Sequence, residues 1–436
     1  MKRSSIVLIV VLIIVFLTGN SSALEISKIG LVQTNGYVSQ GYIYTNHNNF
    51  LADTEGHGTS QFTEAGINIS SDVSKRLRLD IQFFAKDLGQ MGNMEVKMGS
   101  AYADYSFSDW LKLRAGKIRI PNSFYTVERD FDMLRTFVFL PQSIYFEGWR
   151  DSLDALTGAG IFGYVSTGIP GNFEYHVYSG NANIEPECGV AKLFQKTVPP
   201  AMDLKVENIN VNSTHISQLI WDTILGLDDL KIAASVLYLD FDIRSSFNNG
   251  NKLIYNGGTT PSDPTEVPNY TLARSETMTK VKNLTYNYSL EYTYGSTILA
   301  GEYNRNISEI TPATSGSMKE YIADGWYASL THRFSSWFEI GTYYSEYYPD
   351  IYDRDGKKKV AAGLNPPGQE HNNWVKDTCV ATRFDMSPYW IFKLEGHSMN
   401  GSALMYDDDD NYDASGQHID YEEDWYMVAA KLSYSF

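Results

Sequence analysis

The chain closes with the stretch WYMVAAKLSYSF, from Trp425 to Phe436, and this stretch decides the fold. Its residues alternate in character, so the two sides of a strand would differ. One side carries Tyr426, Val428, Ala430, Leu432, Tyr434 and Phe436, and the other carries Met427, Ala429, Lys431, Ser433 and Ser435. About ten residues suffice for a tilted strand to cross a bilayer. The stretch therefore predicts a transmembrane β-strand with a lipid side and a water side. The edge strand of a soluble β-sandwich is the alternative that these residues leave open.

The same period of two recurs along most of the chain, which is hard to reconcile with helices. Because lipid cannot satisfy an open sheet edge, strands that cross a membrane must close into a barrel. The pattern predicts an all-β fold, a transmembrane antiparallel β-barrel. We expect about sixteen strands, an even number as in single-chain bacterial barrels, near residues 35–45, 61–70, 77–88, 97–107, 110–120, 155–166, 172–180, 215–225, 231–243, 283–294, 297–307, 322–333, 337–347, 373–385, 390–400 and 425–436.

The predicted strands are joined alternately by short and long connections. Short turns fall near 72–77, 108–109, 168–171, 226–230, 295–296, 335–336 and 386–389. Long loops fall near 46–60, 89–96, 121–154, 181–214, 244–282, 308–321, 348–372 and 401–424. In bacterial barrels the turns are periplasmic and the loops extracellular. The interleaving therefore predicts that both chain ends lie in the periplasm.

The amino terminus has the pattern of a secretory signal peptide. Lys2 and Arg3 precede an apolar run at 6–17, and small residues follow up to Ala23. We expect a signal peptide at 1–23 and a single barrel domain at 24–436. Removing two of 35 basic residues leaves 33 against 52 acidic residues, a net charge of −19. This acidic balance argues against a nucleic-acid partner.

The connection 121–154 is unusually apolar for an external loop, with residues such as Phe124, Phe137 and Phe139. Folding back into the barrel would bury these side chains, so we expect an inward-folded third loop. The loop also carries charges of both signs that could reach the pore: Glu128, Arg129, Asp130, Asp132 and Arg135.

The stretch LRAGKIRIP at 113–121, followed by Asn122 and by Arg129-Asp130, resembles a known junction. It is similar to the segment that joins strand five to loop three in gram-negative outer-membrane porins. The resemblance is closest to the family that includes the phosphate-selective porins O and P. It implies sixteen strands, a homotrimer and a loop-three constriction. It also implies a water-filled outer-membrane channel for passive diffusion of small hydrophilic solutes or ions.

Basic residues on the predicted water side of neighbouring strands are candidates for the pore wall: Arg78, Lys86, Lys112 and Arg114. Lys117 and Arg119 fall on the lipid side of their strand. Either a bulge at Gly116 turns them inward or they lie above the membrane. Loop acids opposite the basic wall would create a transverse field. The overall acidic excess predicts a preference for cations.

The acidic run at 407–410 is interpreted as a solvated loop, or as a loop that divalent ions bridge to lipopolysaccharide. The barrel surface itself would contact outer-membrane lipid. Whether Cys188 and Cys379 pair is left open, because they lie far apart in the sequence.

Two other functions remain open at this point. The barrel could be a sheath around an electron-carrying partner, which would need no haem motif of its own. It could also be an outer-membrane hydrolase, since His397 and Ser398 superficially resemble a phospholipase motif. However, adjacent strand residues point to opposite sides, so this pair cannot act together. We expect no enzyme activity and no cofactor, and the scattered histidines show no metal-ligand spacing.

Overall fold

The computed structural model describes residues 24–26, 30–89, 91–127, 129–168, 170–195, 203–223, 229–255, 270–312, 316–405 and 420–436. The predicted signal peptide at 1–23, Glu128 and the acidic run at 407–410 lie outside the described residues. Among the residues that are described, none of the helices is both long and apolar enough to span a membrane.

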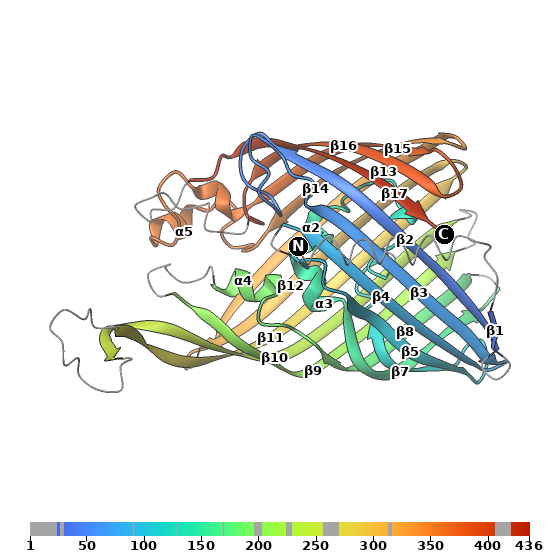
Figure 1. The fold of residues 1–436 in the computed structure, drawn as a ribbon, viewed down its shortest axis with the longest axis horizontal. Coiled ribbons are helices and arrows are strands. Elements are labelled where there is room, and N and C mark those ends of the chain that lie inside the picture. The colour runs from blue at the N-terminus through green and yellow to red at the C-terminus, as the bar shows by residue number, and fades with distance from the viewer. Residues whose placement is uncertain are drawn as a thin grey trace, which may run out of the picture.

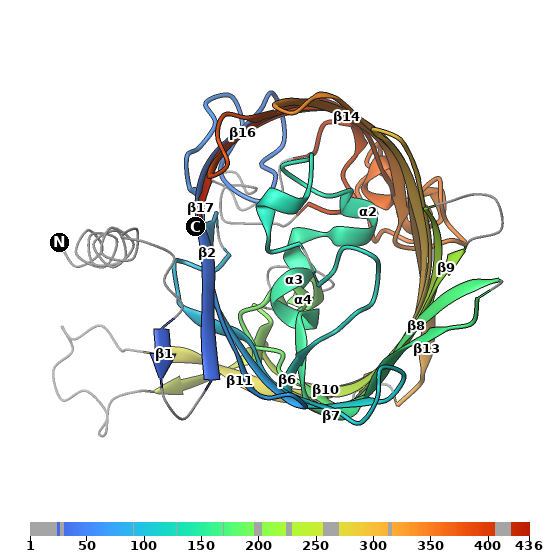
Figure 2. The same ribbon diagram turned by 90° about the vertical axis from the view of Figure 1, so that its right-hand side faces the viewer.

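The chain forms one antiparallel sheet of 17 strands, of which sixteen form a closed ring (Figures 1 and 2). The remaining strand, β1 (Leu24–Ile26), pairs with β2. The ring comprises β2 (Gly30–Thr45), β3 (Phe62–Ser74), β4 (Leu77–Leu88), β5 (Lys97–Ser106), β6 (Lys112–Arg119), β7 (Ala155–Ser166), β8 (Gly171–Ala182), β9 (Lys205–Thr223), β10 (Leu230–Tyr255), β11 (Tyr270–Tyr294), β12 (Thr297–Pro312), β13 (Lys319–Ser335), β14 (Phe338–Tyr348), β15 (Val375–Asp385), β16 (Trp390–Gly401) and β17 (Asp424–Ser435). The predicted all-β barrel of about sixteen strands is confirmed.

The ring closes where the last strand meets the first. β17 pairs with β2 from Met427↔Thr45 to Ser435↔Tyr37. The seam continues past the strand, because the Gly36 and Phe436 backbones exchange hydrogen bonds of 3.1 and 3.0 Å. The end of β17 and the beginning of β2 therefore lie at the short-turn end of the barrel.

The alternation predicted for the closing strand is present in β17. Tyr426, Val428 and Leu432 are exposed on the outer surface, whereas Met427 and Ala429 are buried on the inner side. The outer surface also exposes aromatic residues near the short turns, among them Trp110, Trp337, Tyr389 and Trp390. An apolar belt with aromatic residues near its rim is the surface that a bilayer requires.

Three strands are much longer than their sequence patterns predict. β10 and β11 stay paired from Leu230↔Tyr292 to Tyr255↔Tyr270, across much of the loop predicted at 244–282. β9 begins at Lys205, inside the loop predicted at 181–214. Those two predicted loop boundaries are wrong. The added residues are rich in Ser, Asn, Thr and Lys and have no lipid-type alternation. Paired strands that rise into water need no apolar side, so their sequence resembles that of a loop.

Two connections fold inward and lie within the outline of the ring when it is viewed end-on (Figure 2). The segment 120–154 between β6 and β7, called loop 3 from here on, contains η1 (Asp132–Leu134), α2 (Gln142–Tyr145) and α3 (Glu147–Leu153). The predicted inward loop is thus confirmed. The connection from β8 to β9 carries α4 (Gly189–Gln195) next to α3, a second inward segment that the sequence did not predict. Two short helices, α5 (Lys357–Ala361) and η3 (Glu370–Asn373), lie in the connection from β14 to β15.

Candidate functional site

Loop 3 folds inward because the barrel wall buries its apolar side chains. Val138, Phe139 and Phe146 are each 1 % exposed. The Phe139 ring stacks on Phe62 of β3 at 5.2 Å, and the Phe137 ring lies edge-on to Tyr343 of β14 at 5.1 Å. Burial of each aromatic side chain of this size stabilises the folded state by about 2–3 kcal/mol. The burial of these rings therefore holds the loop across the lumen.

Two buried glutamates on different parts of the wall bind the backbone of loop 3. Glu395 of β16 accepts hydrogen bonds from the Val138 and Phe139 amides at 2.7 and 3.0 Å. Glu302 of β12 accepts one from the Phe124 amide at 3.1 Å and one from the Tyr145 hydroxyl. Because β12 and β16 stand four places apart in the ring, the loop is tied to the wall at two separate points.

Asp132 is the centre of the first ionic cluster of loop 3. Its carboxylate lies 3.1 Å from Lys393 Nζ and 3.3 Å from Lys431 Nζ, on β16 and β17. It also accepts a hydrogen bond from the Ser433 hydroxyl at 2.6 Å and lies 3.4 Å from Arg135. Burial alone would raise the pKa of Asp132, but the surrounding cations hold that pKa well below its usual range.

Arg150 is the centre of the second cluster. Its guanidinium lies 2.5 Å from Asp130, 2.8 Å from Glu64 of β3 and 3.1 Å from Glu147. It also lies over the Phe84 ring, 4.5 Å from the centroid. One planar guanidinium thus binds three carboxylates from loop 3 and the wall, a geometry that a lysine could not reproduce.

The two clusters join into one continuous ion-pair network, because Lys431 pairs with both Glu64 and Asp132. Among the described residues, the network contains seven bases and five acids, so their summed formal charge is +2. Its bases are Lys86, Arg119, Arg129, Arg135, Arg150, Lys393 and Lys431, and its acids are Glu64, Asp130, Asp132, Glu147 and Asp154. A buried network of this kind loses much more when one member is removed than an exposed ion pair does.

We expect the network to weaken in acid. Asp132 lies in loop 3, outside the membrane-spanning strands, and its folded pKa is depressed. Such a group stabilises the folded state above its unfolded pKa, and this contribution is lost as pH falls through the folded pKa. The unfolding temperature in detergent should therefore fall as pH drops below about 4. The fall should be shallower in Asp132→Asn, as measured by circular-dichroism melts. Identical pH slopes in the two proteins would contradict this prediction.

The structure brings the charges predicted for loop 3 together against the wall. Arg129 lies 2.8 Å from Glu147 and donates to the Tyr145 carbonyl, also at 2.8 Å. Asp130 accepts from Arg119 and Arg150. Arg129, Asp130 and Asp132 are each at most 7 % exposed. These side chains are therefore engaged in holding loop 3.

The predicted basic residues of the wall fall into two groups. Lys86 is 2 % exposed and lies 3.5 Å from Glu147, so it belongs to the network. Arg78 and Arg114 lie nearer the short turns, where Asp104 of β5 is the cross-strand partner of both. Arg114 donates two hydrogen bonds to Asp104 at 2.7 and 2.8 Å. The row therefore alternates in charge instead of forming a purely basic ladder.

The remaining candidates lie along β6. Lys112 Nζ lies 5.8 Å from the centroid of the Phe162 ring. Lys117 donates to the Met98 carbonyl, and Arg119 donates to Gln82, Asp130 and Asp154. Pairing of β6 with both neighbours runs through Gly116 without a register shift. Arg119 reaches inward because it is the last residue of β6, where the chain turns into the lumen.

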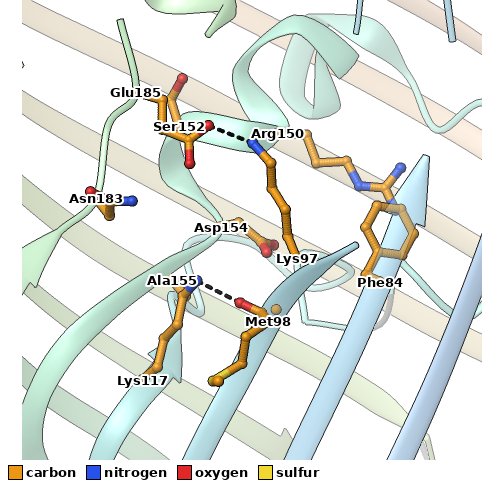
Figure 3. A pocket seen from close by; sticks show the side chains of 11 residues that line it. Phe84, Lys97, Met98, Lys117, Arg150, Ser152, Asp154, Ala155, Asn183 and Glu185 are labelled. Carbon is orange, nitrogen blue, oxygen red and sulfur yellow. Dashed lines mark hydrogen bonds and ion pairs between the residues drawn. The ribbon is translucent and has the colours of Figure 1, made fainter. Parts of the chain in front are cut away.

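Lys117 also borders a cavity of about 60 Å³ between β5, β6 and the end of α3 (Figure 3). The ion pair between Lys97 and Glu185, 2.5 Å apart, lies at this cavity. A space of this size holds a few water molecules.

The wall residues that bind loop 3 were not identified from the sequence. These residues are Glu64, Glu302, Lys393, Glu395 and Lys431. Their strand parity was available, since each lies on the water side of its predicted strand. Their partners in loop 3 were not available, because the paired residues lie far apart in the sequence, 86 residues between Glu64 and Arg150 and 261 between Lys393 and Asp132.

His397 and Ser398 point to opposite sides of β16, as their adjacency predicts. Ser398 is exposed on the outer surface, and His397 is 4 % exposed on the inner side. His397 instead lies beside Asp377 and Cys379 of β15. Cys379 and Cys188 are both buried and free.

Comparison with known proteins gives the same architecture. No protein-family model matches the chain, and no curated protein matches it. Among solved structures, the anion-selective porin from Comamonas acidovorans has a TM-score of 0.53 at 11% identity, covering 93% of this chain and 99% of that chain. OmpF of Salmonella typhi, in a complex with daunomycin, has a TM-score of 0.52 at 10% identity, covering 94% and 99%. OmpT, an outer membrane protein of Vibrio cholerae, has a TM-score of 0.52 at 11% identity, covering 95% and 100%. The chain therefore has the closed β-barrel fold of outer-membrane porins.

Proposed function

We propose that this protein is an outer-membrane porin, a water-filled channel for passive diffusion of small hydrophilic solutes and ions. The observation that carries this proposal is loop 3, which lies across the lumen of a closed barrel and is tied to the wall by buried ion pairs. A constriction fixed in this way sets a pore radius and a local field. Transport then needs no chemical turnover, and the proposed function is not enzymatic.

The proposed setting follows from the surface of the barrel. Its apolar outer belt would face outer-membrane lipid, and the long loops at the opposite rim from the short turns would meet lipopolysaccharide. Both ends of the barrel chain lie at the short-turn rim, which we assign to the periplasm. The homotrimer implied by the porin resemblance is part of the proposal. Native mass measurement in detergent tests it, and a monomer mass would remove it.

Loop 3 occupies the lumen, and this favours a channel over a sheath around another protein. Loop 3 contacts β3 through Glu64, β12 through Glu302 and β16 through Glu395. A sheath would need this space for its partner. The segment cannot leave without breaking the network of ion pairs described above, which would be costly.

The direct test is conductance in planar lipid bilayers. The purified, folded barrel should produce discrete conductance steps, and heat-denatured protein in the same detergent should produce none. If the intact barrel inserts and stays silent, the proposal fails. Insertion is verified independently by protection of the barrel from protease in vesicles.

We expect the channel to prefer cations, as measured by reversal potential under a salt gradient. Without the predicted signal peptide the chain carries a net charge of −19, while six of the seven bases named above for the network are buried and paired. Mobile ions therefore respond mainly to the acidic excess elsewhere. The preference should weaken at high salt because of screening. A reversal potential of the opposite sign would overturn this prediction. It would indicate that the formal charge of +2 on the ion-pair network determines the ion preference.

A further inference from the structure

Three side chains of different chemistry converge on the inner side of β15 and β16, behind loop 3. Cys379 and His397 are cross-strand partners, and Cys379 Sγ lies 3.8 Å from His397 Nε2. Glu395 Oε1 lies 3.0 Å from the same nitrogen. The sulfur, nitrogen and oxygen atoms all lie within 4.8 Å of one another. A thiol, an imidazole and a carboxylate thus face a common point.

The spacing fits one tetrahedral metal ion. Zinc bonds are about 2.3 Å to sulfur and about 2.0–2.2 Å to nitrogen or oxygen. Tetrahedral angles then place sulfur about 3.6 Å from nitrogen, and nitrogen about 3.4 Å from oxygen. The observed separations of 3.8 and 3.0 Å lie within a few tenths of an ångström of these values. Small side-chain rotations would bring three ligands onto one ion.

The surroundings of His397 match those of a metal-binding histidine. Its other ring nitrogen, Nδ1, lies 3.0 and 3.1 Å from the two carboxylate oxygens of Asp377. Asp377 in turn accepts a hydrogen bond from the Tyr343 hydroxyl at 2.8 Å. A carboxylate on the far nitrogen fixes the tautomer and orientation of a ligating imidazole. Nε2 is thereby directed at Cys379 and Glu395.

The cluster also differs from the ion-pair network beside it. Cys379, Glu395, His397 and Asp377 are each at most 4 % exposed. Within the described part of the chain, the ion pairs of Asp377 and Glu395 are both with His397, and neither carboxylate pairs with lysine or arginine. Buried carboxylates are either paired or coordinate a metal. A dication between Cys379, Glu395 and His397 would balance these carboxylates in place of a protonated His397.

We propose that Cys379, His397 and Glu395 form a binding site for a zinc-like divalent cation. A thiolate, an imidazole and one carboxylate favour zinc over calcium or magnesium, which prefer oxygen ligands. Binding releases the Cys379 thiol proton to solvent, together with the Nε2 proton of His397 when the ring is charged, so that Nε2 is free to bind the ion. Since Glu395 also accepts the Val138 and Phe139 amides, the ion would fasten loop 3 to β16.

Cobalt(II) is the probe for this site, because a bound thiolate gives it a charge-transfer band in the near ultraviolet. The full chain, reduced and freed of metal with a chelator, receives Co²⁺ either after folding in detergent or during refolding from urea. We expect one Co²⁺ per chain in at least one of the two preparations, with intense visible bands of four-coordinate cobalt. Zn²⁺ should displace it. No bound cobalt in either preparation of folded barrel would overturn the site, leaving His397 as a cation between two carboxylates.

Three variants separate the site from other thiols. Cys379→Ser should lose the charge-transfer band, whereas Cys188→Ser, the matched control at the other buried cysteine, should keep it. Asp377→Asn should weaken cobalt binding by about 10–100-fold while the band stays in place. Each variant is first checked for heat-modifiable migration, and Asp377→Asn decides the matter if Cys379→Ser does not fold. A band that survives in Cys379→Ser, or disappears in Cys188→Ser, contradicts the assignment.

The proposed metal site is additional to the proposed channel function, and the cobalt-binding test does not require the barrel to conduct. Cobalt binding to a barrel that does not conduct would keep the site and remove the channel. Conductance without cobalt binding would do the opposite.

Discussion

Replacing Asp132 with asparagine should lower the free energy of unfolding by about 3–5 kcal/mol, the typical cost of removing one partner from a buried ion pair. The amide keeps the shape but loses the charge, which leaves Lys393, Lys431 and Arg135 buried around a neutral group. Their mutual repulsion should push loop 3 away from β16 and β17. We therefore expect a lower melting temperature in detergent and a larger, noisier single-channel conductance in planar bilayers.

Asp72→Asn is the matched control, because Asp72 forms an exposed ion pair with Arg78 at 3.3 Å. Exposed pairs contribute about 0–1 kcal/mol, so this variant should melt close to the wild type. Equal melting temperatures for Asp132→Asn and Asp72→Asn would show that burial does not strengthen the contribution of Asp132.

Replacing Arg150 with methionine should have an effect of similar size on the other half of loop 3. The substitution leaves Asp130, Glu64 and Glu147 without the guanidinium they share. The expected loss is again about 3–5 kcal/mol, since buried carboxylates are left with too few partners. Thermal melts measure the loss. Increased proteolysis of loop 3 in the folded barrel measures the release of the segment.

Arg150→Lys distinguishes geometry from charge. A lysine restores the positive charge but cannot bind three carboxylates in one plane, so it should recover only part of the stability. Arg78→Met serves as the exposed counterpart and should melt near the wild type. Full recovery by lysine would mean that Arg150 acts only as a point charge.

The barrel was predictable because strand alternation is a local property. In β17, the side of each residue can be counted from the sequence, and Tyr426 and Met427 lie on the sides expected of them. The inward course of loop 3 was also predictable, because Phe137, Phe139 and their neighbours are too apolar for a solvent-exposed loop.

The long strands β9, β10 and β11 and the inward helix α4 could not be predicted in this way. Residues 244–255 lack an apolar side because they need none above the membrane. The segment of α4 is short, and the apolar cluster that buries Ala191 includes residues from four different strands. A local sequence pattern cannot predict the packing of one short helix against several distant strands.

The sequence could not show that the residues of the proposed metal site are neighbours, because this depends on the register of two strands. Cys379 faces His397 only because β15 and β16 pair with one particular offset across the turn at 386–389. A shift of one residue would place the two side chains on opposite sides of the sheet. Cys379, Glu395 and His397 could therefore be placed on strands from the sequence, but not next to one another.

The seam between β2 and β17 imposes an order of events on folding. Glu64 lies near the start of the chain, yet its partner Lys431 belongs to the last strand. Ser433, which donates to Asp132, also becomes available only when synthesis is almost finished. Contacts so distant in sequence form late, because the intervening chain must first be brought together. The terminal strand thus completes two tasks in a single step. It closes the barrel wall and it fixes loop 3 across the lumen. A folding intermediate in which β17 is not yet paired would therefore have an unconstricted lumen.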